Sequence, residues 1–285
     1  MNYLLNNSLT PIARRKSFDL IEKAVSNIKL KGHKVIFVGI SGGQASGTTK
    51  ISKYFNSRID RSQIIEELSF YKNDKKERKL QEGDEYLITD INNNYSQKRR
   101  KYLIDICFPD SFDYDKFYLT LKKLSEGQKT KIEYFDEEKC EFIPEKDIII
   151  DPVQTPLIIV EGYYIFKDQR VKEMLNLKIY KDVEDDVRLS RLILREEKYL
   201  NKDKNAYKIF FDIYAKYFKI SFKENIYPYK SGANIQLPDY KIQNENNEIE
   251  EDETLEFLIR NLTYFTKKKK LKALINIFYY KFILK

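Results

Sequence analysis

Tryptophan is absent from the 285 residues of this protein, which also contain only one histidine and two cysteines. Two cysteines cannot form a framework of disulfide bridges, so we expect free thiols in a reducing compartment such as the cytoplasm. Cys107 and Cys140 have no cluster of histidines to join them, because His33 lies before the first predicted strand. Inert thiols are therefore the favoured interpretation, and metal binding by the pair is the minor alternative.

Long apolar runs are also missing. No segment reaches about 18 uninterrupted apolar residues, and the first residues lack the basic start, apolar stretch and cleavage site of a secretory signal. We therefore expect no membrane span. The segment at 266–285 joins a lysine cluster to an apolar run. This pattern predicts a helix that docks on the domain or on a partner at least as well as one that lies on an anionic membrane.

The charge of the chain is only moderately one-sided, with 52 basic against 44 acidic residues and a formal net charge of +8. The lysines are scattered, and such lysines usually serve only to solvate a surface, so we expect no nucleic-acid partner. With 42% apolar and 34% charged residues, the composition is typical of a soluble globular protein that can form its own core.

Strands alternate with helices along most of the chain. Continuous β-branched runs at 34–40 and 155–160 are typical of strands buried on both faces, and further strands are predicted at 63–70, 177–183 and 233–238. Apolar residues at helical spacing predict helices at 17–30, 48–58, 97–106, 111–127, 255–265 and from 185 to about 223. Short alternating runs at 131–151 predict a hairpin-like insertion, and 241–253 an acidic loop. This order predicts an α/β fold with a parallel sheet covered by helices on both faces.

A glycine-rich segment joins the first strand to the next helix, and it consists of Gly42, Gly43, Gln44, Ala45, Ser46, Gly47, Thr48 and Thr49. Glycines let successive N–H groups turn toward a phosphate, and a helix N-terminus adds partial positive charge. We predict a nucleotide-binding loop, with a simple tight turn as the alternative. The pattern GxxxxGK[ST] requires lysine where Thr48 stands. The lysine is Lys50 instead, and two residues turn a helical side chain by about 200°, away from the β- and γ-phosphates.

The chain resembles the uridine kinase (uridine-cytidine kinase) family of P-loop nucleoside kinases from about Lys34 to Phe265. Its blocks GISGGQASGTT, LSFYKN, FPDSFDYD, IIVEGYYIF, YKDVEDDVRLSRLILRE and ANIQLP are similar, in order, to that family's phosphate loop, DSFY, HPDAFD, VLFEGI, lid-helix and late-strand segments. The resemblance implies a P-loop fold with a helical lid. It also implies transfer of the γ-phosphoryl group of ATP to the 5′-hydroxyl of uridine or cytidine in the presence of Mg²⁺.

The resemblance assigns roles to particular side chains. It implies catalysis by Glu161, Arg191 and Arg195, Mg²⁺ binding by Thr49 and Glu161, nucleotide binding by residues 42–49 and Arg188, and substrate binding by Tyr71 and Asp136. Two plainer alternatives stay open. Glu161 would also serve as a carboxylate that caps a sheet edge, and arginines three or four residues apart near Asp185 and Asp186 also form ordinary helix ion pairs.

Several positions depart from the family pattern. The DSFY aspartate, the family's general base, falls on Leu68, which cannot accept a proton, and Glu67 should point to the opposite face of a strand. Further polar family residues fall on Cys107, Phe108, Phe135, Cys140, Leu192 and Leu200. Two hypotheses follow: a weakened uridine/cytidine kinase, or a catalytically impaired module that binds nucleotide. A kinase of the pantothenate- or phosphoribulokinase-like type, acting on another small hydroxyl substrate, is a third.

The domain boundaries expected from these patterns are a helical extension at 1–33, the kinase-like domain at 34–265 and the basic and apolar tail at 266–285. The resemblance further implies a homo-oligomer.

Overall fold

The computed structural model describes residue 19 and residues 21–28, 34–72, 82–89, 96–201, 204–239 and 254–267. His33, the acidic loop predicted at 241–253 and almost all of the predicted tail lie outside the described residues. Within the described ranges, none of the helices combines the length and the apolar character needed to cross a bilayer.

Five parallel strands form the central sheet, in the order β2-β7-β1-β8-β9. Their bounds are Ile36–Gly42 for β1, Ser62–Glu66 for β2, Leu157–Gly162 for β7, Leu177–Lys181 for β8 and Ile235–Leu237 for β9. Every residue of β1 and of β7 is buried, as their continuous apolar runs predict. The predicted α/β fold with a parallel sheet is therefore confirmed.

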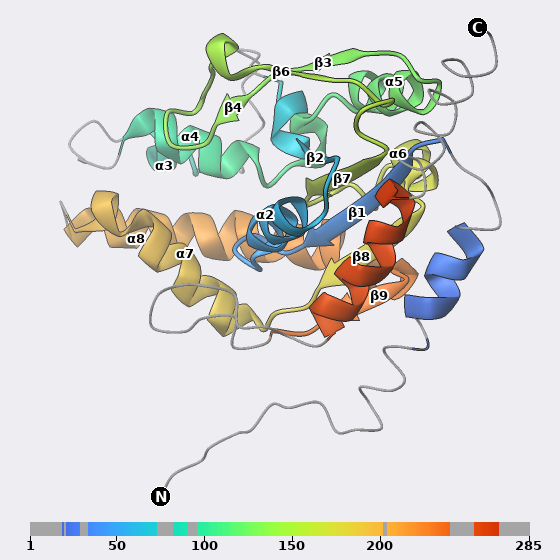
Figure 1. Ribbon diagram of the computed structural model, residues 1–285. Coiled ribbons are helices and arrows are strands. Elements are labelled where there is room, and N and C mark those ends of the chain that lie inside the picture. The colour runs from blue at the N-terminus through green and yellow to red at the C-terminus, as the bar shows by residue number, and fades with distance from the viewer. Residues whose placement is uncertain are drawn as a thin grey trace, which may run out of the picture.

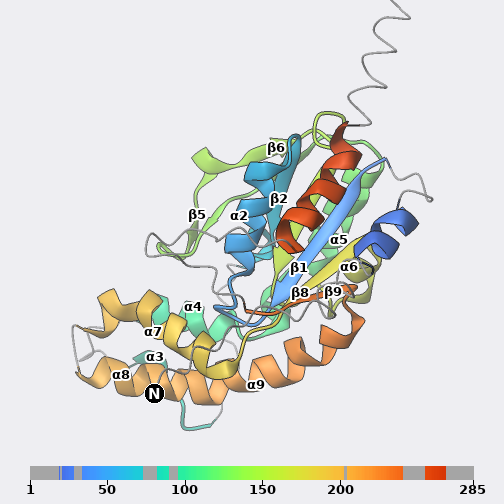
Figure 2. The same cartoon turned by 60° about the horizontal axis from the view of Figure 1, so that its bottom comes forward.

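One face of the sheet is covered by α2 (Thr48–Arg58) and by the helical residues 21–28 and 254–267, which share a single hydrophobic cluster. α2 and the helix at 254–267 lie side by side over the strands (Figures 1 and 2). Ile21, Val25 and Ile28 are buried in the same cluster, as the three-and-four spacing of that segment predicts. The helix at 21–28 thus contributes to the core of the kinase-like domain.

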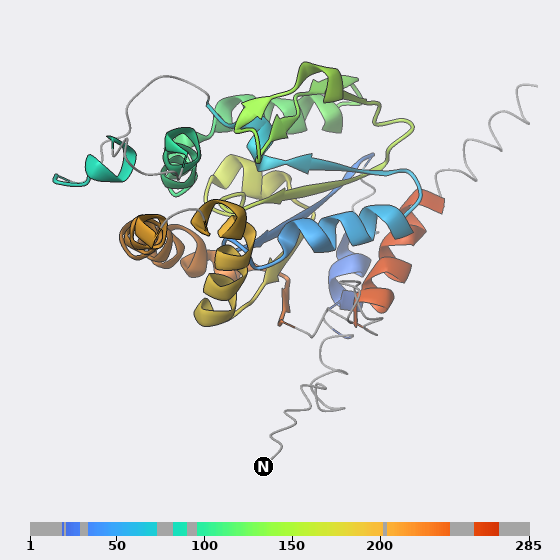
Figure 3. The ribbon, with the colours of Figure 1, turned by 90° about the vertical axis from the view of Figure 1, so that its left-hand side faces the viewer.

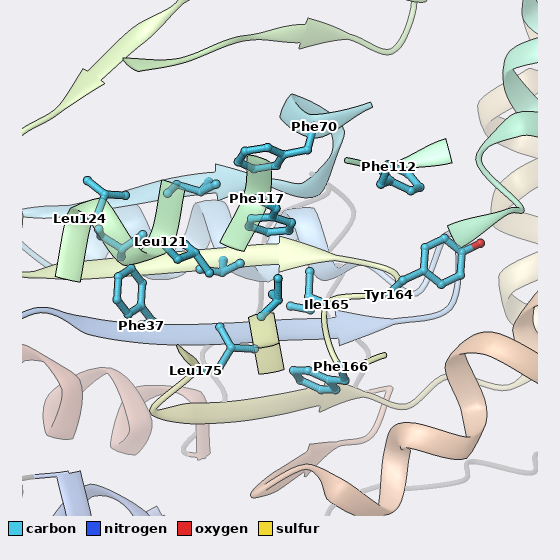
Figure 4. Close-up of a cluster of buried hydrophobic side chains, with 14 of the residues drawn as sticks. Phe37, Phe70, Phe112, Phe117, Leu121, Leu124, Tyr164, Ile165, Phe166 and Leu175 are labelled. Atoms are coloured by element: carbon cyan, nitrogen blue, oxygen red, sulfur yellow. The ribbon is translucent and has the colours of Figure 1, made fainter. Parts of the chain in front are cut away.

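The opposite face packs against α5 (Tyr114–Ser125) and α6 (Gln169–Met174). Figure 4 shows this second core, in which Phe37, Leu121, Leu124 and Leu175 fill the space between the strands and the helices. The rings of Phe70 and Phe117 stack here, with their centroids 4.1 Å apart. The sheet is therefore covered on both faces, as expected (Figure 3).

The insertion between α5 and β7 consists of two antiparallel strand pairs. β3 (Thr130–Ile132) pairs with β6 (Ile148–Ile150), and β4 (Phe135–Asp136) pairs with β5 (Glu141–Phe142). The hairpin predicted for 131–151 is thereby confirmed.

Helices gather at one end of the sheet, where the chain forms α3 (Tyr86–Thr89), α4 (Gln97–Asp105), α7 (Asp185–Leu200) and α8 (Lys204–Ile213) (Figure 1). The helix continues beyond α8 through π-helical turns at Tyr214–Phe218 and Phe222–Ile226, on either side of α9 (Lys219–Ser221). Of these helices, α7 is the one that carries the segment similar to the family's lid helix.

The strand predicted at 63–70 is shorter than expected. β2 ends at Glu66, and Glu67–Phe70 form a turn of 3₁₀-helix. The cause is a contact distant in sequence: the Glu67 carboxylate accepts the backbone N–H of Tyr163 at 2.7 Å and that of Tyr164 at 3.2 Å. This contact draws the chain out of the sheet, so the prediction of one strand up to Phe70 was wrong.

Candidate active site

The glycine-rich segment forms a tight bend between β1 and α2. Ala45 and Gly47 have positive φ angles of 61° and 90°, and the N–H of Ser46 donates to the carbonyl of Gly43 at 2.9 Å. Alternation of left-handed with other backbone conformations turns successive N–H groups to one side and creates an anion-binding concavity. α2 begins directly afterwards at Thr48, so the helix N-terminus points at the same place.

Two buried side chains of the bend carry polar atoms without hydrogen-bond partners among the described residues. They are both amide atoms of Gln44, which is fully buried, and Oγ of Ser46, which is 1% exposed. Buried polar atoms nearly always have a partner, so an unpartnered group calls for one that the chain itself does not provide. A bound phosphate chain would supply acceptors at this place, and the loop therefore fits the nucleotide implied by its sequence.

Glu161 lies beside this bend at the carboxyl end of β7. The Thr48 hydroxyl donates to Glu161 Oε1 at 2.7 Å, and the Thr49 hydroxyl donates to the same oxygen at 2.9 Å. Burial and the neighbouring charge of Glu66 raise the pKa of Glu161 to about 8, although the two hydroxyl groups act in the opposite direction. The structure thus brings together the two side chains predicted to bind Mg²⁺.

A carboxylate and a hydroxyl oxygen are donors that Mg²⁺ accepts. In the described part of the chain, no group of three or more His, Cys, Asp or Glu side chains is arranged to hold a metal ion alone. A Mg²⁺ held by Thr49 and Glu161 would therefore take its remaining ligands from the nucleotide and from water, as Mg²⁺ usually does with phosphates.

The place of the missing lysine is taken by Thr48, which is 4% exposed and is bonded to Glu161. Lys50 lies two residues further along α2, and burial together with the positive charge of Arg191 lowers its pKa.

A pocket of about 550 Å³, including its open side, lies beyond the carboxyl ends of β2 and β7. Its walls come from α2, the end of β2, the insertion and the end of β7, and the residues that line it are Thr49, Lys53, Glu66, Glu67, Leu68, Tyr134, Phe135, Glu137, Glu161, Gly162 and Tyr163. Ligands of parallel α/β sheets bind at this edge, as expected from the strand order. Lys50 does not line the pocket.

Glu67 and Leu68 both line this pocket, so the expectation that they point to opposite faces was wrong. The alternation of side chains ends where β2 ends, at Glu66. The buried carboxylate of Glu67 is held by three donors. Besides the N–H groups of Tyr163 and Tyr164, it accepts the hydroxyl of Tyr114 at 2.7 Å. Burial raises its pKa to about 7 against the effect of these three donors.

The three arginines of α7 have different surroundings. Arg188 is buried, donates to Asp185 Oδ1 at 2.5 Å and stacks on Phe222 with its guanidinium carbon 3.7 Å from the ring centroid. It also abuts the loop, because a Cβ on Gly43 would lie 2.5 Å from Arg188 Nη1. Both interpretations of Arg188, an ion pair within the helix and a place beside the nucleotide loop, therefore agree with its geometry.

Arg191 and Arg195 are paired with acids outside the first turn of α7. Arg191 Nη2 lies 3.0 Å from Asp239 Oδ2. Arg195 Nη1 lies 3.8 Å from Oε1 of Glu137, one of the residues that line the pocket. Arg195 is therefore the arginine of α7 whose ion pair reaches the pocket.

Neither predicted substrate ligand lines the pocket. The hydroxyl of Tyr71 donates to Asp105 Oδ2 at 2.8 Å, and its ring lies against Phe135. Asp136 Oδ1 accepts the N–H groups of Glu138 and Lys139, each at 3.0 Å, and so stabilises the turn of the β4–β5 hairpin. A substrate role for Tyr71 and Asp136 stays a prediction, with these contacts as their structural roles.

Sequence reasoning missed Glu137, which does line the pocket and accepts the hydroxyl of Tyr102 at 2.9 Å. Its signal is weak, since it is one of several acids in the DEEKCE stretch of the insertion. A buried ion pair was likewise not predictable from the sequence pattern. Arg99 of α4 donates from Nε and Nη2 to Glu196 of α7, at 3.0 and 2.5 Å, and thereby joins these two helices.

The two thiols remain free and buried. Cys107 donates to the carbonyl of Leu103 at 3.2 Å, and Cys140 lies 3.9 Å from Arg99 Nη1. Burial raises the pKa of both thiols, which favours the uncharged form.

Comparisons with known proteins identify the family to which the chain belongs. Residues 37–244 match the model of the Phosphoribulokinase / Uridine kinase family. The chain belongs to this family. A uridine kinase of Borrelia duttonii (strain Ly) is 32% identical over 208 residues, which cover 72% of this chain and 87% of that relative.

Uridine kinase-like protein 3 of Arabidopsis thaliana is 29% identical over 206 residues, which cover 70% of this chain but only 38% of that longer protein. Among solved structures, a "putative fructose transport system kinase" from Silicibacter sp. TM1040 superimposes with a TM-score of 0.51 at 15% identity, covering 77% of this chain and 98% of that one. That likeness concerns the fold, which is the α/β architecture of P-loop kinases.

Proposed function

We propose that this kinase-family protein binds Mg·ATP at residues 42–49 and Glu161 and transfers the γ-phosphoryl group to the 5′-hydroxyl of uridine or cytidine, a reaction of pyrimidine salvage in the cytoplasm. One observation carries the proposal. Both loop hydroxyls, of Thr48 and Thr49, bond to the carboxylate of Glu161 beside a pocket at the carboxyl edge of the sheet. These features support phosphate binding at the bend, Mg²⁺ binding at Thr49 and Glu161, and a second substrate at the pocket.

Phosphoryl transfer depends mostly on positioning and on neutralising the charge of the transferring group. Arg195 and Arg191 on α7 are the side chains proposed for that neutralisation, and Arg188 supports the loop. The loop lysine is absent, and loss of one donor to a transition state typically costs about 100- to 1000-fold in rate. Turnover should therefore be slow relative to a kinase that has the lysine.

A coupled experiment tests this function. Binding of Mg·ATP to the full chain is measured by calorimetry, and phosphorylation of uridine and cytidine is then followed by chromatography. We expect binding and slow product formation, with product abolished by Glu161→Gln. Absence of Mg·ATP binding would contradict the proposal. Light scattering of the same sample measures the homo-oligomer implied by the family resemblance.

A second candidate function is a catalytically impaired module that binds nucleotide. Thr48 at the lysine position and Leu68 in the pocket wall are the observations that favour it. Tight binding of Mg·ATP without product from either nucleoside would select this candidate.

A further inference from the structure

Four glutamates line the pocket, and three of them already have partners. Glu67 accepts backbone N–H groups, Glu161 accepts threonine hydroxyls, and Glu137 accepts the hydroxyl of Tyr102. Glu66 differs, because its carboxylate forms neither a hydrogen bond nor an ion pair with any residue that the structure describes. It is therefore the pocket carboxylate that is available to a ligand.

The sheet directs Glu66 toward the nucleotide loop. β2 and β7 are parallel, and Glu66 is the register partner of Glu161, so the two side chains leave the same face of the sheet about 4.8 Å apart along the ladder. Two residues earlier, Ile64 and Ile159 are also partners, and both belong to the cluster beneath α2. Glu66 thus faces α2, whose first turn carries Thr49.

The reaction proposed above needs a group that accepts the proton of the attacking hydroxyl, a role commonly filled by a carboxylate in kinases. We propose that Glu66 is this catalytic base, an inference that rests on the proposed kinase function. The substrate hydroxyl gives its proton to the Glu66 carboxylate, and its oxygen forms a bond to the γ-phosphorus. The bond from that phosphorus to the β,γ-bridging oxygen breaks, and ADP leaves with the electron pair.

The local backbone explains why the base comes from this position. Leu68 stands two residues further on, in the 3₁₀ turn, and offers no acceptor. Between them, Glu67 is held by N–H groups of the β7–α6 connection. Glu66 is the last residue of the strand, so its place is fixed by the ladder and its side chain is left free for substrate.

The test compares Glu66→Gln and Glu66→Asp with wild type in the full chain. Measurements are kcat and KM for uridine and cytidine, the equilibrium affinity for Mg·ATP, and thermal unfolding to establish that each variant folds. We expect Glu66→Gln to lower kcat by about 100- to 10,000-fold, the usual contribution of a general base, with the affinity for Mg·ATP unchanged. Glu66→Asp keeps a carboxylate but retracts it by about one bond, so kcat should fall less, by up to about 100-fold. Glu145→Gln, an exposed glutamate of the insertion, is the matched control that should leave kcat unchanged.

The failure of this inference differs from the failure of the proposed function. If wild type forms product and Glu66→Gln forms it equally fast, the base is another group and only the inference is overturned. The inference also falls if Glu66→Gln weakens Mg·ATP binding as much as it slows turnover, because Glu66 would then act on the metal or the nucleotide. If wild type forms no product, both the kinase function and the base are overturned. Recovery of turnover by adding Leu68→Asp to Glu66→Gln would support the assignment, because it returns a carboxylate to the same pocket.

Discussion

Moving the displaced lysine back into the phosphate loop should accelerate phosphoryl transfer. The perturbation is the double variant Thr48→Lys, Lys50→Thr, which changes the sequence from TTK to KTT and leaves the net charge unaltered. In the wild type, the residue at position 48 contributes only a hydroxyl bonded to Glu161, and the lysine stands two residues further along α2. The variant places a positive charge at the start of α2, beside the phosphates.

The expected magnitude follows from the groups gained and lost. One well-placed donor to the transition state is worth about 100- to 1000-fold, or about 3 to 4 kcal/mol. The variant loses the bond from Thr48 to Glu161, but Thr49 still donates to the same oxygen at 2.9 Å. A lysine there would also favour the ionised form of Glu161, whose pKa is otherwise about 8. Because the departures elsewhere in the site remain, we expect the lower end of the range, about 100-fold in kcat/KM for ATP.

The assay is steady-state phosphorylation of uridine over a series of ATP concentrations, with Mg·ATP affinity measured separately. Lys50→Thr alone is the control, since it removes the same lysine without relocating it and should not raise kcat/KM. The reasoning would be refuted by a folded double variant with the kcat/KM and ATP affinity of wild type. That result would mean that position 48 does not face the β- and γ-phosphates.

Three further predictions concern stability. The Glu67 pKa of about 7 exceeds its ordinary 4.5, so its stabilisation is complete below about pH 4.5 and is lost as the pH rises through about 7, a change of about 3 kcal/mol. In the wild type, the free energy of unfolding measured by urea titration should therefore fall by about that amount between about pH 5 and pH 8. Glu67→Gln should remove this pH dependence, and a variant that keeps it would contradict the prediction. Arg99→Met removes two donors from the buried carboxylate of Glu196, which also lies 3.5 Å from Arg195 Nε, and should cost about 1 to 3 kcal/mol in the same assay. Adding Glu196→Leu should recover part of this loss, and a loss below about 0.5 kcal/mol would be incompatible with the buried pair. Gly162→Ala would place a Cβ 2.4 Å from the Cβ of Glu67 and should cost about 1 to 3 kcal/mol of stability in thermal unfolding. Gly232→Ala is the control and should be tolerated, because only Lys172 lies within 4 Å of the added Cβ. Equal losses of stability in the two variants would argue against the close contact at Gly162.

The sequence predicts most of the fold because its strands and helices carry local signals. β1 and β7 are continuous apolar runs, and α2 spans Thr48–Arg58, the same residues that its pattern indicates. The glycine-rich bend between β1 and α2 needs conformations that glycine adopts easily, as the φ of 90° at Gly47 shows. Each of these features depends on neighbours in sequence, and each is therefore visible without the structure.

The end of β2 was not predictable in this way. Apolar residues continue through Leu68 and Phe70, but β2 ends at Glu66, where the Glu67 carboxylate accepts N–H groups from nearly a hundred residues later in the chain. The pocket role of Glu137 depends equally on the hairpin that carries it to the sheet edge. Long-range contacts of this kind decide which acids enter the site.

Because long-range contacts decide which side chains enter the site, the missing family residues cannot be interpreted from the sequence positions alone. Alignment compares one position at a time, and by that measure Leu68 removes the base and Thr48 removes the cation. The pocket, however, collects side chains from four separate elements, so Glu66 and Lys53 line the same space although neither stands at the position of an aligned family residue. Loss of an aligned residue therefore does not establish loss of its chemistry, and the decisive quantity is which charged groups face the bound substrates. For this reason we propose the slow kinase ahead of the inactive module, and the turnover assay decides between them.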